Sequence, residues 1–150
     1  MWIEEAMCGA YSLVGLKSLN NLDDWWRENG LPYLEGILQG AYAFGQVDAE
    51  YVSARANALC AANHLSDDIQ PISGLIFSKI ASDRIIEDNI ALSRVPVGTD
   101  VATFLRAWAK ECGGATTTPE LLLNLWTDDH ARPVGAIEDE PSSAIVELGE

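Results

Sequence analysis

Imidazole and paired carboxylates coincide at two places in this 150-residue chain, and these side chains are the best suited to chemistry. The two segments are His64-Leu65-Ser66-Asp67-Asp68 and Asp128-Asp129-His130. Carboxylate oxygens and imidazole nitrogens bind divalent cations, so the segments together could serve a small metal-dependent enzyme that uses His64 and His130. Neither segment has the spacing of a recognised metal motif, and helix capping with a solvated turn explains both more simply. We therefore expect no metal and no cofactor.

Nucleophilic catalysis has still less support in the sequence. Cys8, Cys60 and Cys112 lie on or beside apolar stripes, where a thiol is normally inert packing. There is no Gly-x-Ser-x-Gly elbow and no phosphate loop ending in Gly-Lys-Ser/Thr. The cysteines are odd in number and widely spaced, which favours reduced thiols, and acid at Glu4-Glu5 stands where a signal peptide needs base. We expect a cytoplasmic protein that is neither an enzyme nor membrane-bound.

The charge balance is the most informative property of the chain. Acidic residues number 23 against 9 basic ones, which gives a net charge of −14 at pH 7. Much of the acid comes as short runs: Glu4-Glu5, Asp23-Asp24, Asp67-Asp68, Glu87-Asp88, Asp128-Asp129 and Glu138-Asp139-Glu140. Such a field repels nucleic acid and anionic lipid and attracts basic protein surfaces. Residues 113–150 carry 8 acids and 1 base, so the excess is concentrated near the C-terminal end.

An aromatic pair stands within one acidic stretch. Trp25 and Trp26 are adjacent, so on a helix they point about 100° apart, and one of them is a candidate for an exposed anchor. The alternative, slightly the simpler, is that both are buried between helices. An aromatic side chain surrounded by acid is typical of an interface for a basic partner. The candidate partner-binding residues are Asp23, Asp24, Trp25, Trp26, Glu28, Asp128, Asp129, Glu138, Asp139 and Glu140.

The elements that would position these residues are predicted to be mainly α-helical. Helical periodicity and turn residues indicate a compact bundle of five to seven short helices over 1–130, followed by an acidic extended or mobile tail over 131–150. Residues 33–63 predict a helical hairpin, with Gly45 as a left-handed stop and Asp48 as the next N-cap. Over residues 84–95 the charge spacing favours a helix, and the β-branched residues leave a short β-hairpin as the alternative.

Two later helices are better defined. Thr99 is expected to cap the first, which carries an apolar stripe to Cys112 and ends at Gly113-Gly114. Thr118-Pro119-Glu120 is expected to start the second. Residues 118–126 are apolar on most sides, so this helix is predicted to be central or to form a homodimer contact. Trp2, Trp108 and Trp126 lie on apolar stripes and are predicted to be core residues.

These features predict a non-catalytic protein that occludes a basic, nucleic-acid-binding surface of another protein, such as a nuclease. Immunity proteins and phage-encoded inhibitors of bacterial defence nucleases act in this way. Three alternatives stay open: a DNA mimic that fills a DNA-binding cleft, the metal-dependent enzyme, and a homo-oligomeric structural protein. The mimic requires carboxylates at regular intervals along one face of the fold.

Overall fold

A computed structural model describes residues 2–19, 24–25, 27–30, 32, 39, 42–61, 67–97 and 100–126. This part of the chain is mainly α-helical and contains no strand, which confirms the predicted class. Its elements are α1 (Trp2–Leu19), the 3-10 helix η1 (Tyr42–Gln46), α3 (Ala49–Ala54), α4 (Ala56–Ala61), α5 (Gln70–Lys79), α6 (Ser82–Leu92), α7 (Val101–Cys112) and α8 (Thr118–Leu125). The predicted tail over 131–150 lies outside the described residues.

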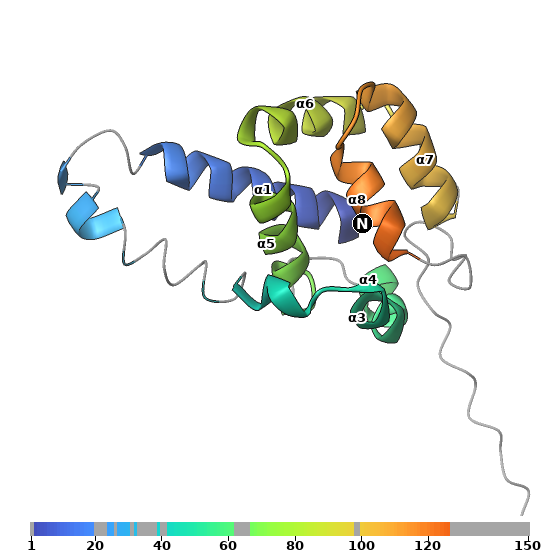
Figure 1. The fold of residues 1–150 in the computed structure, drawn as a ribbon, viewed down its shortest axis with the longest axis horizontal. Coiled ribbons are helices and arrows are strands. Elements are labelled where there is room, and N and C mark those ends of the chain that lie inside the picture. Colours follow the sequence, from blue (N-terminus) through green and yellow to red (C-terminus); the bar gives the residue numbers. More distant parts are fainter. Residues whose placement is uncertain are drawn as a thin grey trace, which may run out of the picture.

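Helix α1 is the longest of the described helices, and α5 and α8 lie against its N-terminal half (Figure 1). It packs chiefly against α5 and also against α6, while α8 packs against α7, α3 and α6. One buried hydrogen bond joins the first pair: the Ser73 hydroxyl of α5 donates to the carbonyl of Ala6 in α1 at 3.0 Å. No helix within the described ranges has both the length and the apolarity needed to cross a bilayer.

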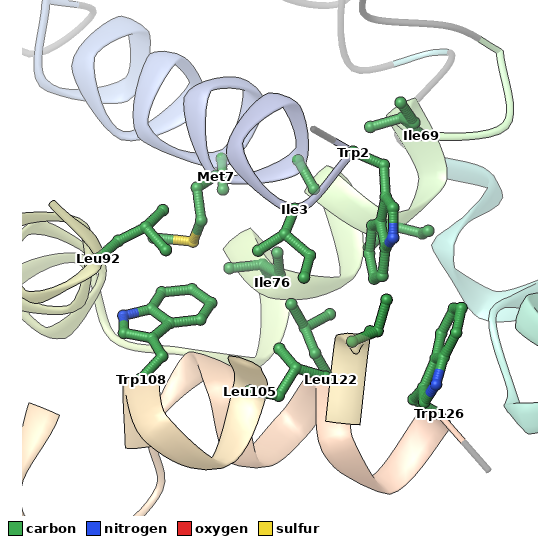
Figure 2. Close-up of a cluster of buried hydrophobic side chains, with 14 of the residues drawn as sticks. Trp2, Ile3, Met7, Ile69, Ile76, Leu92, Leu105, Trp108, Leu122 and Trp126 are labelled. Carbon is green, nitrogen blue, oxygen red and sulfur yellow. The ribbon is translucent and has the colours of Figure 1, made fainter. Parts of the chain in front are cut away.

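The core is formed where α1, α5, α7 and α8 meet (Figure 2). Trp108 of α7 has no exposed surface, and Met7 of α1 and Leu92 of α6 lie close to its ring. The indoles of Trp2 and Trp126 stack at the other end of this core. All three predicted core tryptophans are therefore buried, as expected from their positions on apolar stripes.

Helix α8 is central to the chain's own core. Leu122 and Trp126 are buried, while Leu121, Leu123 and Leu125 are partly buried against the same core. Intrachain packing therefore accounts for the apolar character of 118–126, which was the observation behind a homodimer through this segment.

Three predicted helix ends need correction. Gly45 is not a left-handed stop: it lies inside η1 with an ordinary φ, and the chain turns through a hydrogen bond from the Val47 N–H to the Phe44 carbonyl at 3.0 Å. Asp100, not Thr99, caps α7, because its side chain accepts a hydrogen bond from the Thr103 N–H at 2.9 Å. Thr117, not Thr118, caps α8, in a capping box with Glu120.

Other predicted ends are confirmed. Asp48 caps α3 by accepting a hydrogen bond from the Tyr51 N–H at 2.8 Å. Gly113 and Gly114 end α7 with φ of 61° and 81°, a region that glycine enters without steric cost. The second helix of the hairpin predicted over 33–63 is divided at Arg55 into α3 and α4, and most of the first lies outside the described residues.

The β-hairpin alternative for residues 84–95 is wrong, since α6 covers residues 82–92. Arg84 and Asp88 lie one turn apart and form an ion pair with Nε and Oδ1 3.0 Å apart. Ile85 and Leu92 face the core on the same side of the helix as Asp88. Burial of this face outweighs the β-propensity of the branched residues.

Candidate functional site

The candidate anchor Trp25 lies on a short helical segment, of which residues 24–25 and 27–30 are described. Its side chain is 64% exposed, so the alternative in which both tryptophans are buried is wrong for Trp25. Asp24 is 90% exposed and forms an ion pair with Arg27, with Oδ1 and Nη1 3.2 Å apart. Glu28 is also exposed. An aromatic ring and two carboxylates are thus presented together within one helical turn.

The remaining predicted partner-binding residues lie outside the described part of the chain: Asp23, Trp26, Asp128, Asp129, Glu138, Asp139 and Glu140. The two histidines of the alternative metal site, His64 and His130, also lie outside it. Among the residues that are described, no group of three His, Cys, Asp or Glu side chains is placed to hold a metal ion. Those predictions remain predictions.

Many acidic residues in the described part have a local structural role. Asp48, Asp100 and Glu120 satisfy backbone N–H groups at the starts of α3, α7 and α8. Others pair with arginine: Asp24 with Arg27, Asp68 with Arg55, and both Glu87 and Asp88 with Arg84. These carboxylates therefore lie at helix starts or beside arginines, where they are stabilised locally.

The acidic excess is unevenly divided along the chain. Fourteen of the 23 acidic residues and eight of the nine basic residues fall within the described ranges. The rest of the chain therefore has nine acids and one base, in far fewer residues. The described residues therefore have a net charge of −6, and the other residues have −8, of which residues 127–150 contribute −6.

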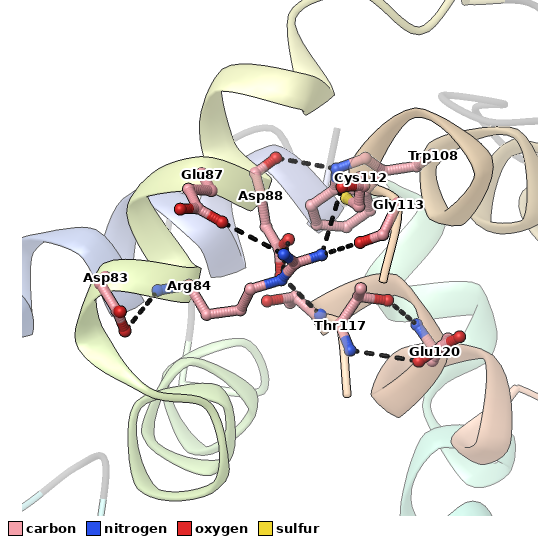
Figure 3. A network of polar contacts seen from close by, with 10 residues as sticks. Asp83, Arg84, Glu87, Asp88, Trp108, Cys112, Gly113, Thr117 and Glu120 are labelled. Atoms are coloured by element: carbon pink, nitrogen blue, oxygen red, sulfur yellow. Dashed lines mark hydrogen bonds and ion pairs between the residues drawn. The ribbon is translucent and has the colours of Figure 1, made fainter. Parts of the chain in front are cut away.

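A buried polar network among the described residues is centred on Asp88 of α6, whose side chain has no exposed surface (Figure 3). One carboxylate oxygen accepts a hydrogen bond from the backbone N–H of Thr118 at 2.7 Å, and the other pairs with Arg84. The backbone carbonyl of Asp88 accepts a hydrogen bond from the indole of Trp108 at 2.8 Å. One residue of α6 thereby holds both α7 and the first residue of α8.

Arg84 completes this network from the partly exposed side. Its Nη1 pairs with Glu87 Oε2 at 3.1 Å, and its Nη2 donates to the carbonyls of Cys112, at 3.3 Å, and Gly113. Figure 3 shows the guanidinium between Asp88 and the end of α7. The positive charge compensates the buried carboxylate, which would otherwise be costly to remove from water.

The described thiols differ in their suitability for chemistry. Burial, a hydrogen bond to Asp88 and the charge of that carboxylate raise the pKa of Cys112 to about 12, so its thiol stays protonated and is a poor nucleophile. Cys60 is buried. Cys8 is exposed on α1, so the expectation that it is packing material is wrong. Cys8 lies at the edge of the apolar stripe of α1, and this edge faces solvent.

A second polar cluster fixes α3 to the turn that precedes α5. The Arg55 guanidinium lies 3.9 Å from the centre of the Tyr51 ring and pairs through Nε with Asp68 Oδ1 at 3.2 Å. The Tyr51 hydroxyl donates to the Asp68 carbonyl at 3.0 Å. Burial raises the pKa of Tyr51; the Arg55 charge opposes this effect and the Asp68 charge adds to it. The contacts are those of a structural clamp.

Sequence reasoning missed the role of Asp88, although a signal was present. Asp88 follows Ile85 by three residues and precedes Leu92 by four, which is the spacing of a core stripe. A charged residue at such a position requires a buried partner. The four-residue spacing of Arg84 and Asp88 predicted a helix but not a buried ion pair. Nothing in the sequence shows that the turn between α7 and α8 packs against α6.

Comparison with protein-family models, with curated protein sequences and with solved structures gave no match.

Proposed function

We propose that this chain is a non-catalytic, cytoplasmic binding protein that occludes a basic, nucleic-acid-binding surface on another protein. The observation that carries the proposal is the 64% exposed indole of Trp25 beside the exposed carboxylates of Asp24 and Glu28. Tryptophan is enriched at the energetic centres of protein interfaces. A large exposed indole next to acid suits a partner surface that offers arginine or lysine together with apolar area.

Long-range charge supports the same proposal. A net charge of −14 speeds the encounter with a positively charged groove and disfavours direct contact with nucleic acid. Because residues 127–150 carry seven acids and one base, the acids at 128–129 and 138–140 are proposed to add to the attraction. The partner would be a nuclease or another nucleic-acid-binding protein, as for immunity and anti-defence inhibitors.

Affinity capture from a host lysate tests this proposal. The immobilised wild-type chain is compared with Trp25→Ala, with the double variant Asp24→Asn/Glu28→Gln, and with Tyr11→Ala as the control. Tyr11 is the matched site because it is another exposed aromatic residue, at 46%, on a different helix. We expect a basic nucleic-acid-binding protein to be retained at low salt and released by high salt or by competing duplex DNA.

Both test variants should lose that partner, and Tyr11→Ala should retain it. A captured protein that is acidic, that resists salt, or that binds Trp25→Ala as well as wild type would contradict the proposal. If a partner is captured, binding of the purified partner to the chain is measured at 50 and 500 mM salt. The ratio of the two dissociation constants gives the salt dependence of the complex.

A further inference from the structure

The turn between α7 and α8 has a backbone that needs support. Gly113, Gly114 and Thr116 have φ of 61°, 81° and 60°. The left-handed region suits glycine but is unfavourable for a threonine, which is β-branched. Residues 113–116 are all exposed, so the turn itself buries little side-chain surface. Its conformation must therefore be maintained largely by polar contacts and by the helices at its two ends.

Those contacts converge on Arg84 and Asp88 of α6. Arg84 donates to the carbonyls of Cys112 and Gly113 at the start of the turn. A Cβ placed on Gly114 would lie 3.7 Å from Nη1 of Arg84, so the guanidinium rests against the backbone of the turn. Asp88 accepts the Thr118 N–H at the end of the turn. The Arg84–Asp88 ion pair links the two ends to each other.

The neighbouring core has buried contacts of its own, outside residues 113–116. Phe104, Leu105 and Trp108 anchor α7 with exposed fractions of 2% or less. On the opposite side, α1 and α5 pack directly against each other. A region with few buried apolar contacts beside a well-packed core is where local opening occurs in preference to global unfolding.

We propose that Arg84 is a latch, and that its release lets the exposed residues 113–116 and the end of α7 open away from α6, while the helical core, including the buried Thr117 and Thr118, stays folded. The latch is a conformational device independent of the proposed binding site at residues 24–28. Release frees the carbonyls of Cys112 and Gly113 from the guanidinium and exposes the end of α7, including Cys112.

Cys112 makes the opening measurable, because the closed and open states predict opposite changes. In the closed state the Arg84 charge lowers the pKa of Cys112, against burial and the Asp88 carboxylate, which raise it to about 12. Removing Arg84 from a turn that stays closed would make the thiol less acidic and slower to alkylate. If the turn opens, burial and the Asp88 contact are lost, and the thiol becomes faster to alkylate.

The experiment measures iodoacetamide labelling of each cysteine by peptide mass spectrometry at pH 8.5. The variants are Arg84→Met, Arg84→Lys, and Glu87→Gln as the matched control, since Glu87 is the exposed partner of the same guanidinium. Exposed Cys8 reports reagent activity, and buried Cys60 reports global unfolding. Arg84→Met should label Cys112 at least about tenfold faster than wild type, with Cys60 and Cys8 unchanged.

Arg84→Lys keeps the charge but lacks the planar fork that reaches Asp88 and the carbonyls together, so an intermediate rate is expected. Glu87→Gln should behave as wild type. Unchanged or slower labelling of Cys112 in Arg84→Met overturns the latch. Parallel acceleration of Cys60 also overturns it, because the whole domain then opens. If Arg84→Met does not fold, faster Cys112 labelling in Arg84→Lys with Cys60 protected supports the latch, and no such difference refutes it.

Discussion

The indole of Trp2 stacks on that of Trp126, with ring centroids 5.8 Å apart and an interplanar angle of 21°. Both rings are buried, with exposed fractions of 2% and 3%. The contact joins the first turn of α1 to the residue that follows α8, and it closes the core on the side away from Trp108 (Figure 2).

Truncation of this stack should be far more damaging than truncation of the exposed indole. We expect Trp126→Ala to lower the free energy of unfolding by about 3–5 kcal/mol, because a large buried ring leaves a cavity. Trp25→Ala should change it by less than about 0.5 kcal/mol. Urea denaturation followed by circular dichroism measures both. Similar losses for the two variants would mean that Trp25 is packed rather than exposed.

Two adjacent threonines should respond in opposite directions to the same substitution. Thr117→Val removes the side-chain acceptor of the α8 capping box and should cost about 1 kcal/mol. Thr118 is completely buried, and its Oγ1 has no hydrogen-bond partner among the described residues, so Thr118→Val should be neutral or stabilising by up to about 1 kcal/mol. Thermal unfolding of the pair checks this. A Thr118→Val variant less stable than Thr117→Val would show that the hydroxyl is bonded.

Glycine substitutions should distinguish the two turns. Gly114 has φ of 81°, so Gly114→Ala should destabilise the fold by about 1 kcal/mol. Gly45 has an ordinary φ inside η1 and open space around a built Cβ, so Gly45→Ala should stabilise it by about 0.4–1 kcal/mol. Melting temperatures of both variants against wild type provide the measurement. If Gly45→Ala instead destabilises the fold, the result would favour the left-handed conformation that the sequence predicts for Gly45.

Acid should weaken the cap of α7. Asp100 accepts hydrogen bonds from the backbone N–H and the side-chain hydroxyl of Thr103. Both bonds, the backbone one more strongly, lower the pKa of Asp100 below its ordinary value of 3.8. This stabilisation is fully present above the unfolded-state pKa and is lost as the pH falls through the lower folded-state pKa. Asp100→Asn keeps a capping oxygen but does not titrate.

The measurement is urea unfolding of wild type and Asp100→Asn from pH 6 down to pH 2. The advantage of the wild type should shrink across the acid end of that range. A constant difference between the two proteins would show that the Asp100 carboxylate gains nothing from its Thr103 contacts.

Much of the fold was predictable because helix signals are local. Asp48 and the Gly113-Gly114 pair act as the sequence indicates, since capping and positive φ depend on a few neighbouring residues. Two of the errors lie where adjacent residues could serve equally. Thr99 and Asp100 are both good caps, as are Thr117 and Thr118, and only the backbone angles select one.

The interior polar contacts were not predictable, because they join residues far apart in the chain. Asp88 receives the Thr118 N–H from 30 positions away, and Arg84 reaches the Gly113 carbonyl from 29. The exposure of Trp25 was also undetermined, since helical geometry shows only that two adjacent rings diverge. Local pattern predicts which segments are helical, and tertiary contact determines which charges are buried.

The Trp2–Trp126 stack has a consequence for the order of events on the ribosome. Trp2 is synthesised first, and its partner follows 124 residues later, which takes about 6–25 s at 5–20 residues per second. During that interval the apolar side of the nascent N-terminal helix lacks its final cover. Nascent chains stalled before Trp126 leaves the ribosome should therefore recruit chaperones that release once Trp126 has emerged.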